Sequence, residues 1–149
     1  MTNTKLEDII NCIHAQGVKV RLLTNCYLLG VGDHMRIASL CDEVVAGFCF
    51  TDDEDFKKIH RPLQELHFTP AKQTKSMIDF SHQYKGRFTL RVLLVKGYND
   101  SNKKAEELKK VVDQVKYDEL WVTTWPKFNV SDERVAEINK IIRGESVAS

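Results

Sequence analysis

The sequence predicts an α/β protein built on a parallel sheet of about four strands that helices cover. Three observations predict this class. Segments with the two-residue period of a strand alternate with segments of helical period, one strand segment is apolar throughout, and no repeat or linker interrupts the alternation. Because each helix must return the chain to the same end of the sheet, the strands are expected to be parallel. With 149 residues, the chain is expected to form a single domain over residues 1–149.

Ten elements are expected, in the order α-β-α-β-α-α-β-α-β-α. They are a helix over 6–16, a strand over 18–23, a helix over 33–40, a strand over 44–50, a helix that Thr51 or Asp52 begins and Pro62 ends, a helix over 76–84, a strand over 87–96, a helix over 102–115, a strand over 119–125 and a helix over 132–143.

The first four elements are predicted from the spacing of their apolar residues and from the residues that begin or end each segment. Leucine and isoleucine recur at helical spacing between an N-cap at Thr4 and a stop at Gly17, which predicts the first helix. The first strand alternates until Thr24 and Asn25 end the run. A short segment of helical period follows, and the next strand is apolar throughout, as expected for a strand buried on both faces.

The later elements depend on caps and on alternation. The connection over 64–74 contains Pro70 and is expected to be irregular up to the next helix. The third strand gives the clearest alternation in the chain. Ser101 or Asn102 is expected to cap the helix that follows it, and Ser131 the last helix.

Composition and charge exclude several classes of protein. The 22 basic and 21 acidic residues give a formal net charge of +1, so charge does not indicate a nucleic-acid or membrane-surface partner. The apolar runs are far shorter than the ~18 residues of a membrane span, and the N-terminus reads as a polar helix start rather than a signal peptide. A cytoplasmic location is therefore expected.

The cysteines and histidines show no metal-binding spacing. Cys12, Cys26, Cys41 and Cys49 form no close pair, and the five histidines form no HxxxH or HExxH sequence. Reduced, partly buried thiols are expected. A metal or redox role for Cys26 and Cys49, which both follow strands, is the less favoured alternative.

Candidate site residues lie where the strands end, because ligands of parallel α/β sheets bind outside the carboxyl ends of the strands. Thr24 and Asn25 follow the first strand, and Asn99 follows the third. Threonine and asparagine also end strands through local hydrogen bonds, and Asn99 suits the turn before a helix, so a structural role stays open for all three.

Arg91 is the fourth candidate. If the alternating apolar residues of the third strand face the helices, Arg91 points to the concave side of the sheet. An inward arginine needs an anion or a carboxylate partner. The choice between a bound ligand and a structural ion pair with Glu43 or Asp118 stays open.

Three segments carry short motifs whose order along the chain is informative: RLLTNCYLLG, DEVVAGFCFTDDEDFKKIHRP and RFTLRVLLVKGYND. They resemble the later strands of the radical S-adenosylmethionine (SAM) barrel, in which a Thr-Asn-Gly strand end, an Asp-Glu-Val strand, a Phe-x-x-Ile-x-Arg-Pro helix and a strand ending near Gly-Tyr-Asn follow one another. The corresponding positions here are Thr24, Asn25, Cys26, Phe56, Ile59, Arg61, Pro62, Gly97, Tyr98 and Asn99. The pattern is similar to the branch of wyosine-type tRNA-modifying enzymes.

The resemblance covers about residues 18–125 and implies a partial (β/α) barrel of about four strands that binds S-adenosylmethionine. Thr24, Asn25, Arg91 and Asn99 would be its cofactor-binding residues. Members of the family hold a [4Fe-4S] cluster with a CxxxCxxC loop, which this sequence lacks, along with the Gly-Gly-Glu turn. Reductive cleavage of the sulfonium needs that cluster, so this chain by itself is not expected to perform it.

The resemblance therefore implies the C-terminal part of a split, truncated or degenerate barrel, with a cluster only if a complementary N-terminal half supplies it. Enzyme activity stays undecided. The alternatives are a non-catalytic binding or interaction module that kept the scaffold, and a fragment that does not fold durably. Exposed sheet edges predict pairing with a complementary half or self-association. The substrate is not readable from these residues.

Overall fold

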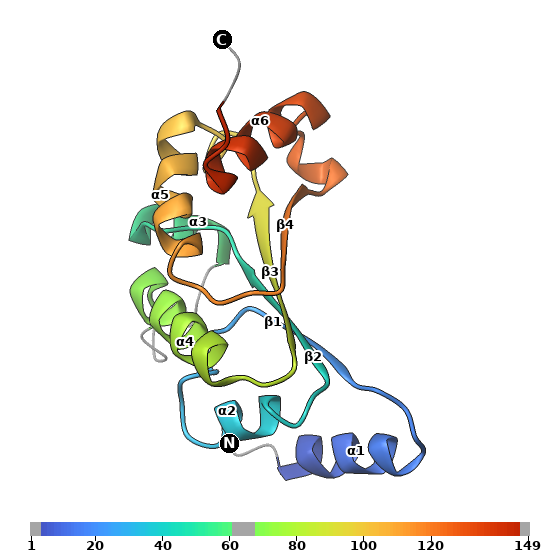
Figure 1. The fold of residues 1–149 in the computed structure, drawn as a ribbon. Coiled ribbons are helices and arrows are strands. Elements are labelled where there is room, and N and C mark those ends of the chain that lie inside the picture. Colours follow the sequence, from blue (N-terminus) through green and yellow to red (C-terminus); the bar gives the residue numbers. More distant parts are fainter. Residues whose placement is uncertain (1–3, 61–67, 147–149) are drawn as a thin grey trace.

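The protein is described by a computed structural model over residues 4–60 and 68–146. One sheet of four parallel strands, in the order β1-β2-β3-β4, forms its centre (Figure 1). The elements are α1 (Thr4–Ala15), β1 (Arg21–Thr24), α2 (His34–Ala38), β2 (Glu43–Phe48), α3 (Asp53–His60), α4 (Pro70–Gln83), β3 (Arg87–Leu94), α5 (Asn102–Val112), β4 (Glu119–Thr124), the 3-10 helix η2 (Pro126–Phe128) and α6 (Asp132–Arg143). The predicted class and the order of its ten elements are confirmed, and η2 is an addition.

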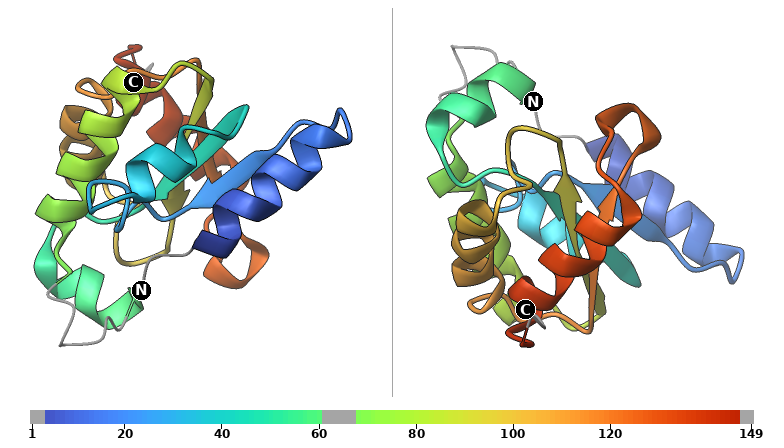
Figure 2. Two further views of the ribbon diagram at one scale, coloured as in Figure 1. Left: turned by 90° about the horizontal axis from the view of Figure 1, so that it is seen from below. Right: turned by 90° about the horizontal axis from the view of Figure 1, so that it is seen from above.

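Helices cover one face of the sheet, which we call the convex face, and the opposite face is called the concave face. Helices α4 and α5 lie next to one another on the convex face, and α1 projects from the far end of the molecule (Figures 1 and 2). Phe88, Leu90, Val92 and Leu94 of β3 are each at most 2% exposed and belong to the main core with residues of α4, α5 and α6. The predicted orientation of β3 is thus confirmed. Alternate residues of the strands face the concave side, where the described chain places no helix layer.

Each strand is shorter overall than predicted, although β1 ends one residue later and β2 begins one residue earlier than expected. β1 begins at Arg21 rather than at residue 18, because the backbone amide of Val20 donates to the Asp42 carboxylate at 2.7 Å instead of to a neighbouring strand. β2 runs from Glu43 to Phe48, and β3 and β4 end two and one residues before the predicted positions. The prediction that β2 is buried on both faces is confirmed, because Val44, Val45 and Ala46 are all at most 3% exposed.

The irregular connection predicted over 64–74 is wrong in its second half. Helix α4 begins at Pro70, because proline is tolerated in the first turn, where its missing N–H would have no helical partner. Thr69 caps this start by accepting a hydrogen bond from the Lys72 amide at 3.2 Å. The first half of that connection, together with Arg61 and Pro62 of the predicted motif, lies outside the described residues.

Thr4, the predicted cap of the first helix, instead lies within α1, which begins at this residue. The predicted caps of α3, α5 and α6 are confirmed. Ser101 accepts from the Lys104 amide and Ser131 from the Arg134 amide, each at 3.2 Å. Of the two candidates for the cap of α3, Asp52 accepts from the amide of Asp55 at 2.9 Å. Helix α5 ends at Val112, a turn earlier than predicted.

A second, smaller apolar cluster lies beyond the carboxyl ends of the strands. Its buried members are Tyr27, Cys49, Phe50, Phe56 and Val95. Because these residues come from the loops after β1, β2 and β3 and from α3, the cluster holds three strand ends together. No helix of the described residues is both long enough and apolar enough to span a bilayer.

Candidate functional site

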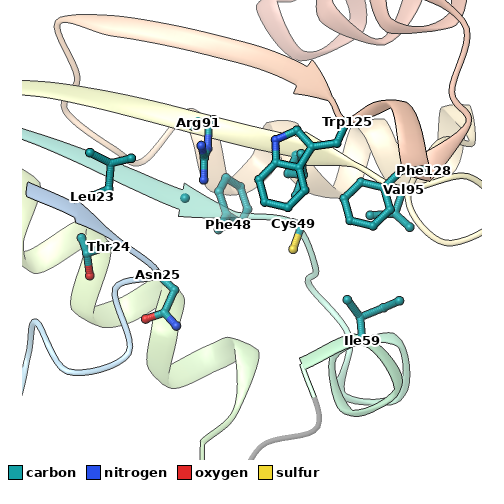
Figure 3. A pocket seen from close by; sticks show the side chains of 12 residues that line it. Leu23, Thr24, Asn25, Phe48, Cys49, Ile59, Arg91, Val95, Trp125 and Phe128 are labelled. Carbon is teal, nitrogen blue, oxygen red and sulfur yellow. The ribbon is translucent and has the colours of Figure 1, made fainter.

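A cavity of about 530 Å³ opens on the concave side at the carboxyl ends of all four strands (Figure 3). This volume falls in the range of pockets that take small molecules. Its lining comes from β1, β2 and β3 and the residues after them, from α3, and from the segment after β4. It consists of Leu23, Thr24, Asn25, Gly47, Phe48, Cys49, Ile59, Arg91, Leu93, Val95, Trp125 and Phe128. The lining is thus largely apolar with a few polar groups, which is the usual composition of a ligand site.

Arg91 carries the positive charge in this lining. Its partly buried side chain points from β3 into the cavity (Figure 3), and its Nε atom is buried with no hydrogen-bond partner among the described residues. The neighbouring position on β2 is Gly47, where an added Cβ would lie 3.3 Å from Nη2 of Arg91. The glycine therefore leaves the space in which the guanidinium lies.

The alternative prediction, that Arg91 forms a structural ion pair with Glu43 or Asp118, is wrong within the described chain. Glu43 pairs with Arg21 and Arg87 at the other end of the sheet. Asp118 accepts a hydrogen bond from the backbone amide of Phe88 at 2.7 Å. Neither carboxylate pairs with Arg91, because the register places Arg91 beside Gly47, four residues along β2 from Glu43. A buried guanidinium N–H without an acceptor is costly, so an anion in the cavity would satisfy it.

Thr24 and Asn25 line the cavity at the end of β1, as predicted. They also form hydrogen bonds within the turn, which is the structural role that was left open for them. The Thr24 hydroxyl accepts from the Cys26 amide at 3.0 Å. Cys26 has a φ of +68°, a conformation that glycine adopts at little cost, and it occupies the position where the family has glycine. The turn thus keeps the left-handed geometry of Thr-Asn-Gly without the glycine.

Gln73 fixes this turn and was not predicted. Its side chain is 1% exposed, and its amide nitrogen donates to the carbonyl oxygens of Asn25 at 2.6 Å and Gly47 at 3.4 Å. It thereby ties the ends of β1 and β2 to α4. Gln73 was overlooked because the helix was predicted to begin at residue 76. Only a helix that begins at Pro70 brings Gln73 to a buried position.

Asn99 does not line the cavity. It is 2% exposed, and all its polar atoms have backbone partners: Oδ1 accepts from the Val95 amide at 2.7 Å, and Nδ2 donates to the carbonyls of Cys49 at 2.7 Å and Leu93 at 2.8 Å. It joins the ends of β2 and β3 just behind the site. Its predicted contact with a cofactor stays a prediction.

Cysteine chemistry in the cavity is suppressed by burial. Burial raises the pKa of the Cys49 thiol to about 12, while the charge of Arg91 acts in the opposite direction. Burial also raises the pKa of Cys26. Both thiols are therefore protonated at neutral pH, which disfavours them as nucleophiles or metal ligands. No group of three or more His, Cys, Asp or Glu side chains among the described residues is placed to hold a metal ion.

Aromatic side chains after β4 border the mouth of the cavity. The rings of Trp125 and Phe128 stack with centroids 5.5 Å apart, and the Lys127 ammonium lies 4.8 Å from the centre of the Trp125 ring. Trp125 is 42% exposed although it lines the cavity. Part of its side chain therefore remains accessible to solvent beside Phe128 and Lys127.

The fold defines a class: an open, parallel α/β half-barrel with a ligand-sized cavity at the carboxyl ends of its strands. Solved structures of similar fold come from radical SAM enzymes. A domain of a pyruvate-formate lyase-activating enzyme from Bacteroides vulgatus ATCC 8482 matches with a TM-score of 0.74 at 15% identity, over 94% of this chain and 84% of that one.

Two structures of TYW1 match as well. One, with a lysine-pyruvate adduct bound, gives a TM-score of 0.68 at 19% identity over 96% of this chain and 46% of its own. The other, an archaeal TYW1, gives 0.64 at 17% identity over 96% and 45%. The resemblance indicated by the motifs is thus confirmed at the level of the fold, and at these identities the likeness shows the fold alone.

No protein-family model matches the chain. A curated relative, the GTPase Obg of Brachyspira hyodysenteriae (strain ATCC 49526 / WA1), is 27% identical over 122 residues, which are 82% of this chain and 18% of that protein. The chain thus spans less than a fifth of this relative's length. It contains no GxxxxGK[ST] phosphate-binding loop, so it lacks the sequence with which P-loop GTPases bind nucleotide.

Proposed function

We propose that this chain forms the ligand-holding part of a radical SAM-type barrel and binds S-adenosylmethionine in the cavity at its strand ends. The observation that carries the proposal is the buried Nε of Arg91, which has no partner in the described chain and points into a cavity of about 530 Å³. The carboxylate of the methionine moiety is an acceptor of the required charge. Thr24 and Asn25 at the end of β1 would hold the cofactor on the opposite side.

The iron-sulfur cluster does not fit the residues of this chain. The sequence has no CxxxCxxC loop. Cys49, which lines the cavity, and Cys26, which is buried after β1, both have raised thiol pKa values. A cluster in the assembled protein would have to be held by residues outside this sequence. Within the proposal, this chain's own residues bind and orient the cofactor, and the apolar lining from Phe48, Ile59 and Leu93 limits the access of water.

A test compares S-adenosylmethionine binding by the wild type and two matched variants. Arg91→Met removes the charge and keeps the length, whereas Lys96→Met removes an exposed cation just beyond β3. Loss of a hydrogen bond to a charged group costs about 1.5–3 kcal/mol, so Arg91→Met should weaken binding roughly 10- to 100-fold. Lys96→Met should change it less than about threefold. Isothermal titration calorimetry measures both.

Folding and binding are separable in this test. Because the Nε of Arg91 has no protein partner to lose, Arg91→Met should unfold at the wild-type temperature or above it. Equal affinity of Arg91→Met and the wild type would remove the assigned role. A wild type without affinity for S-adenosylmethionine would overturn the proposal.

A non-catalytic binding module is the second candidate function. It is favoured by Gly47, Phe48 and Cys49, which offer no polar side chain where the family often has Ser-Leu-Asp to reach the ribose. A module of this kind would take a small anion with an apolar body. Thermal stabilisation by such an anion, with none by S-adenosylmethionine, would favour it over the first proposal.

A further inference from the structure

Four charged side chains, one from each strand, alternate in sign across the amino-terminal end of the concave face. They are Arg21, Glu43, Arg87 and Glu119. Nε of Arg21 lies 2.6 Å from Oε2 of Glu43, Nε of Arg87 lies 3.8 Å from Oε1 of Glu43, and Nη2 of Arg87 lies 2.8 Å from Oε2 of Glu119. We call this row the charge ladder. Its inner members have an opposite charge on both sides.

The two ends of the charge ladder carry opposite, incompletely paired charges. Arg21 ends it at β1 with a side chain 58% exposed, and Glu119 ends it at β4 with one 41% exposed. The Glu119 pKa is lowered first by a hydrogen bond from the Trp121 side chain, then by Arg87, with a smaller contribution from the charge of Arg21. The carboxylate is thus ionised at neutral pH, and a cation approaching the edge of β4 meets a negative charge.

Within residues 4–60 and 68–146, neither edge of the sheet has a further strand beside it. In the described chain β1 pairs with β2 alone and β4 with β3 alone. Apolar side chains are exposed at both edges on the concave side: Leu23 of β1 is 62% exposed and Trp121 of β4 is 38% exposed. Unpaired edges beside exposed apolar surface are sites of strand pairing with another chain.

We propose that a second copy of this chain closes the barrel, with β4 of each copy against β1 of the other. A two-fold axis along the mean strand direction keeps all strands parallel and forms two identical junctions. Eight parallel strands are the number that closes a packed (β/α) barrel. Glu119 of one copy then meets Arg21 of the other at both junctions, so that the charge ladder becomes a closed ring of alternating charge.

The ends of the charge ladder favour a second copy over another occupant. Any partner must present a negative charge next to β1 and a positive charge next to β4, and this chain presents both at its own edges. The carbonyl of Leu120 on β4 accepts a hydrogen bond from Arg143 of α6 at 2.8 Å. Closure of the barrel would replace this bond with one from the neighbouring strand of the second copy. A cluster-bearing segment would use the same edges, so it and the second copy exclude one another.

The experiment measures molar mass in solution by light scattering coupled to size exclusion, without ligand, so its outcome is independent of the proposed function. The wild type is expected at twice 17.2 kDa. Arg21→Glu and Glu119→Arg each place like charges at both junctions and should be monomeric at the same concentration. An equimolar mixture of the two variants should recover the doubled mass, because the introduced glutamate meets the introduced arginine at one junction and the native pair forms the other.

Lys110→Glu and Glu106→Arg, which change charge equally on exposed positions of α5, are the controls and should keep the wild-type mass. Circular dichroism verifies that each variant is folded. A monomeric wild type at about 100 µM would overturn the inference, and so would folded variants that stay monomeric when mixed. A wild-type dimer that neither ladder substitution affects would also overturn it, because the copies would then meet elsewhere.

Discussion

Asn99 is expected to be one of the most sensitive positions of the fold, and Asn99→Ala tests this. The substitution removes three hydrogen bonds of 2.7, 2.7 and 2.8 Å to the backbone of Val95, Cys49 and Leu93. At about 1 kcal/mol of net stabilisation per bond, their loss costs about 3 kcal/mol. The backbone groups left behind are buried, so incomplete hydration raises the cost to as much as about 5 kcal/mol.

The assay is urea unfolding followed by tryptophan fluorescence and circular dichroism, which gives the free energy of unfolding. In a chain of this size the melting temperature should fall by roughly 6–12 °C. Asn139→Ala is the control, since its side chain accepts one exposed bond from Arg143 at 3.0 Å, and it should change the free energy by less than about 0.5 kcal/mol. A loss below about 1 kcal/mol in Asn99→Ala would show that these three bonds do not stabilise the fold to this extent.

Two further predictions concern thiols and acid stability. At pH 8 the exposed Cys12 should react readily with iodoacetamide, whereas Cys49, with a pKa raised to about 12, should react only after unfolding; peptide mapping that finds both labelled at one rate would contradict this. Burial raises the pKa of Asp52, but the bonds from Lys104 and from the Asp55 amide outweigh it and leave the pKa lowered. The ion pair therefore stabilises the protein fully at pH values above the pKa that Asp52 has in the unfolded chain. This stabilisation is lost as the pH falls through the lower pKa that Asp52 has in the folded protein. Asp52→Asn, which keeps the cap of α3, should therefore cost up to about 1 kcal/mol at pH 7 and progressively less as the pH falls below the ordinary aspartate pKa of 3.8. A cost independent of pH in urea unfolding would exclude the ion pair as its source.

Most of the fold was predictable because its elements are locally determined. The apolar period of β3 and the serine caps at Ser101 and Ser131 depend on near neighbours in the chain. The start of α4 was missed because proline is found both in irregular segments, where it prevents a helix, and at the first position of helices. The choice depends on Thr69 acting as a cap, which the composition of the segment does not reveal.

The candidate site was predictable in position and only partly in its members. The rule that ligands bind at strand ends located Thr24 and Asn25, and strand parity placed Arg91 on the concave side. The rule did not indicate that Asn99 lies behind the cavity, because a residue after a strand can turn toward the cavity or back to the backbone. Gln73 carried no local signal, since its partners lie 48 and 26 residues away along the chain.

Short segments of the chain were enough to predict the class of the fold and the order of its elements and to show that a CxxxCxxC loop is absent from the sequence, because period, caps and motif spacing are local properties. The tertiary structure decided which charges meet. Only the register between β2 and β3 separates Arg91 from Glu43 and places it beside Gly47. The same register aligns Arg21, Glu43 and Arg87 in the charge ladder. Pairing energies depend on distances between strands that are far apart in the chain, and these distances are fixed only when the sheet assembles.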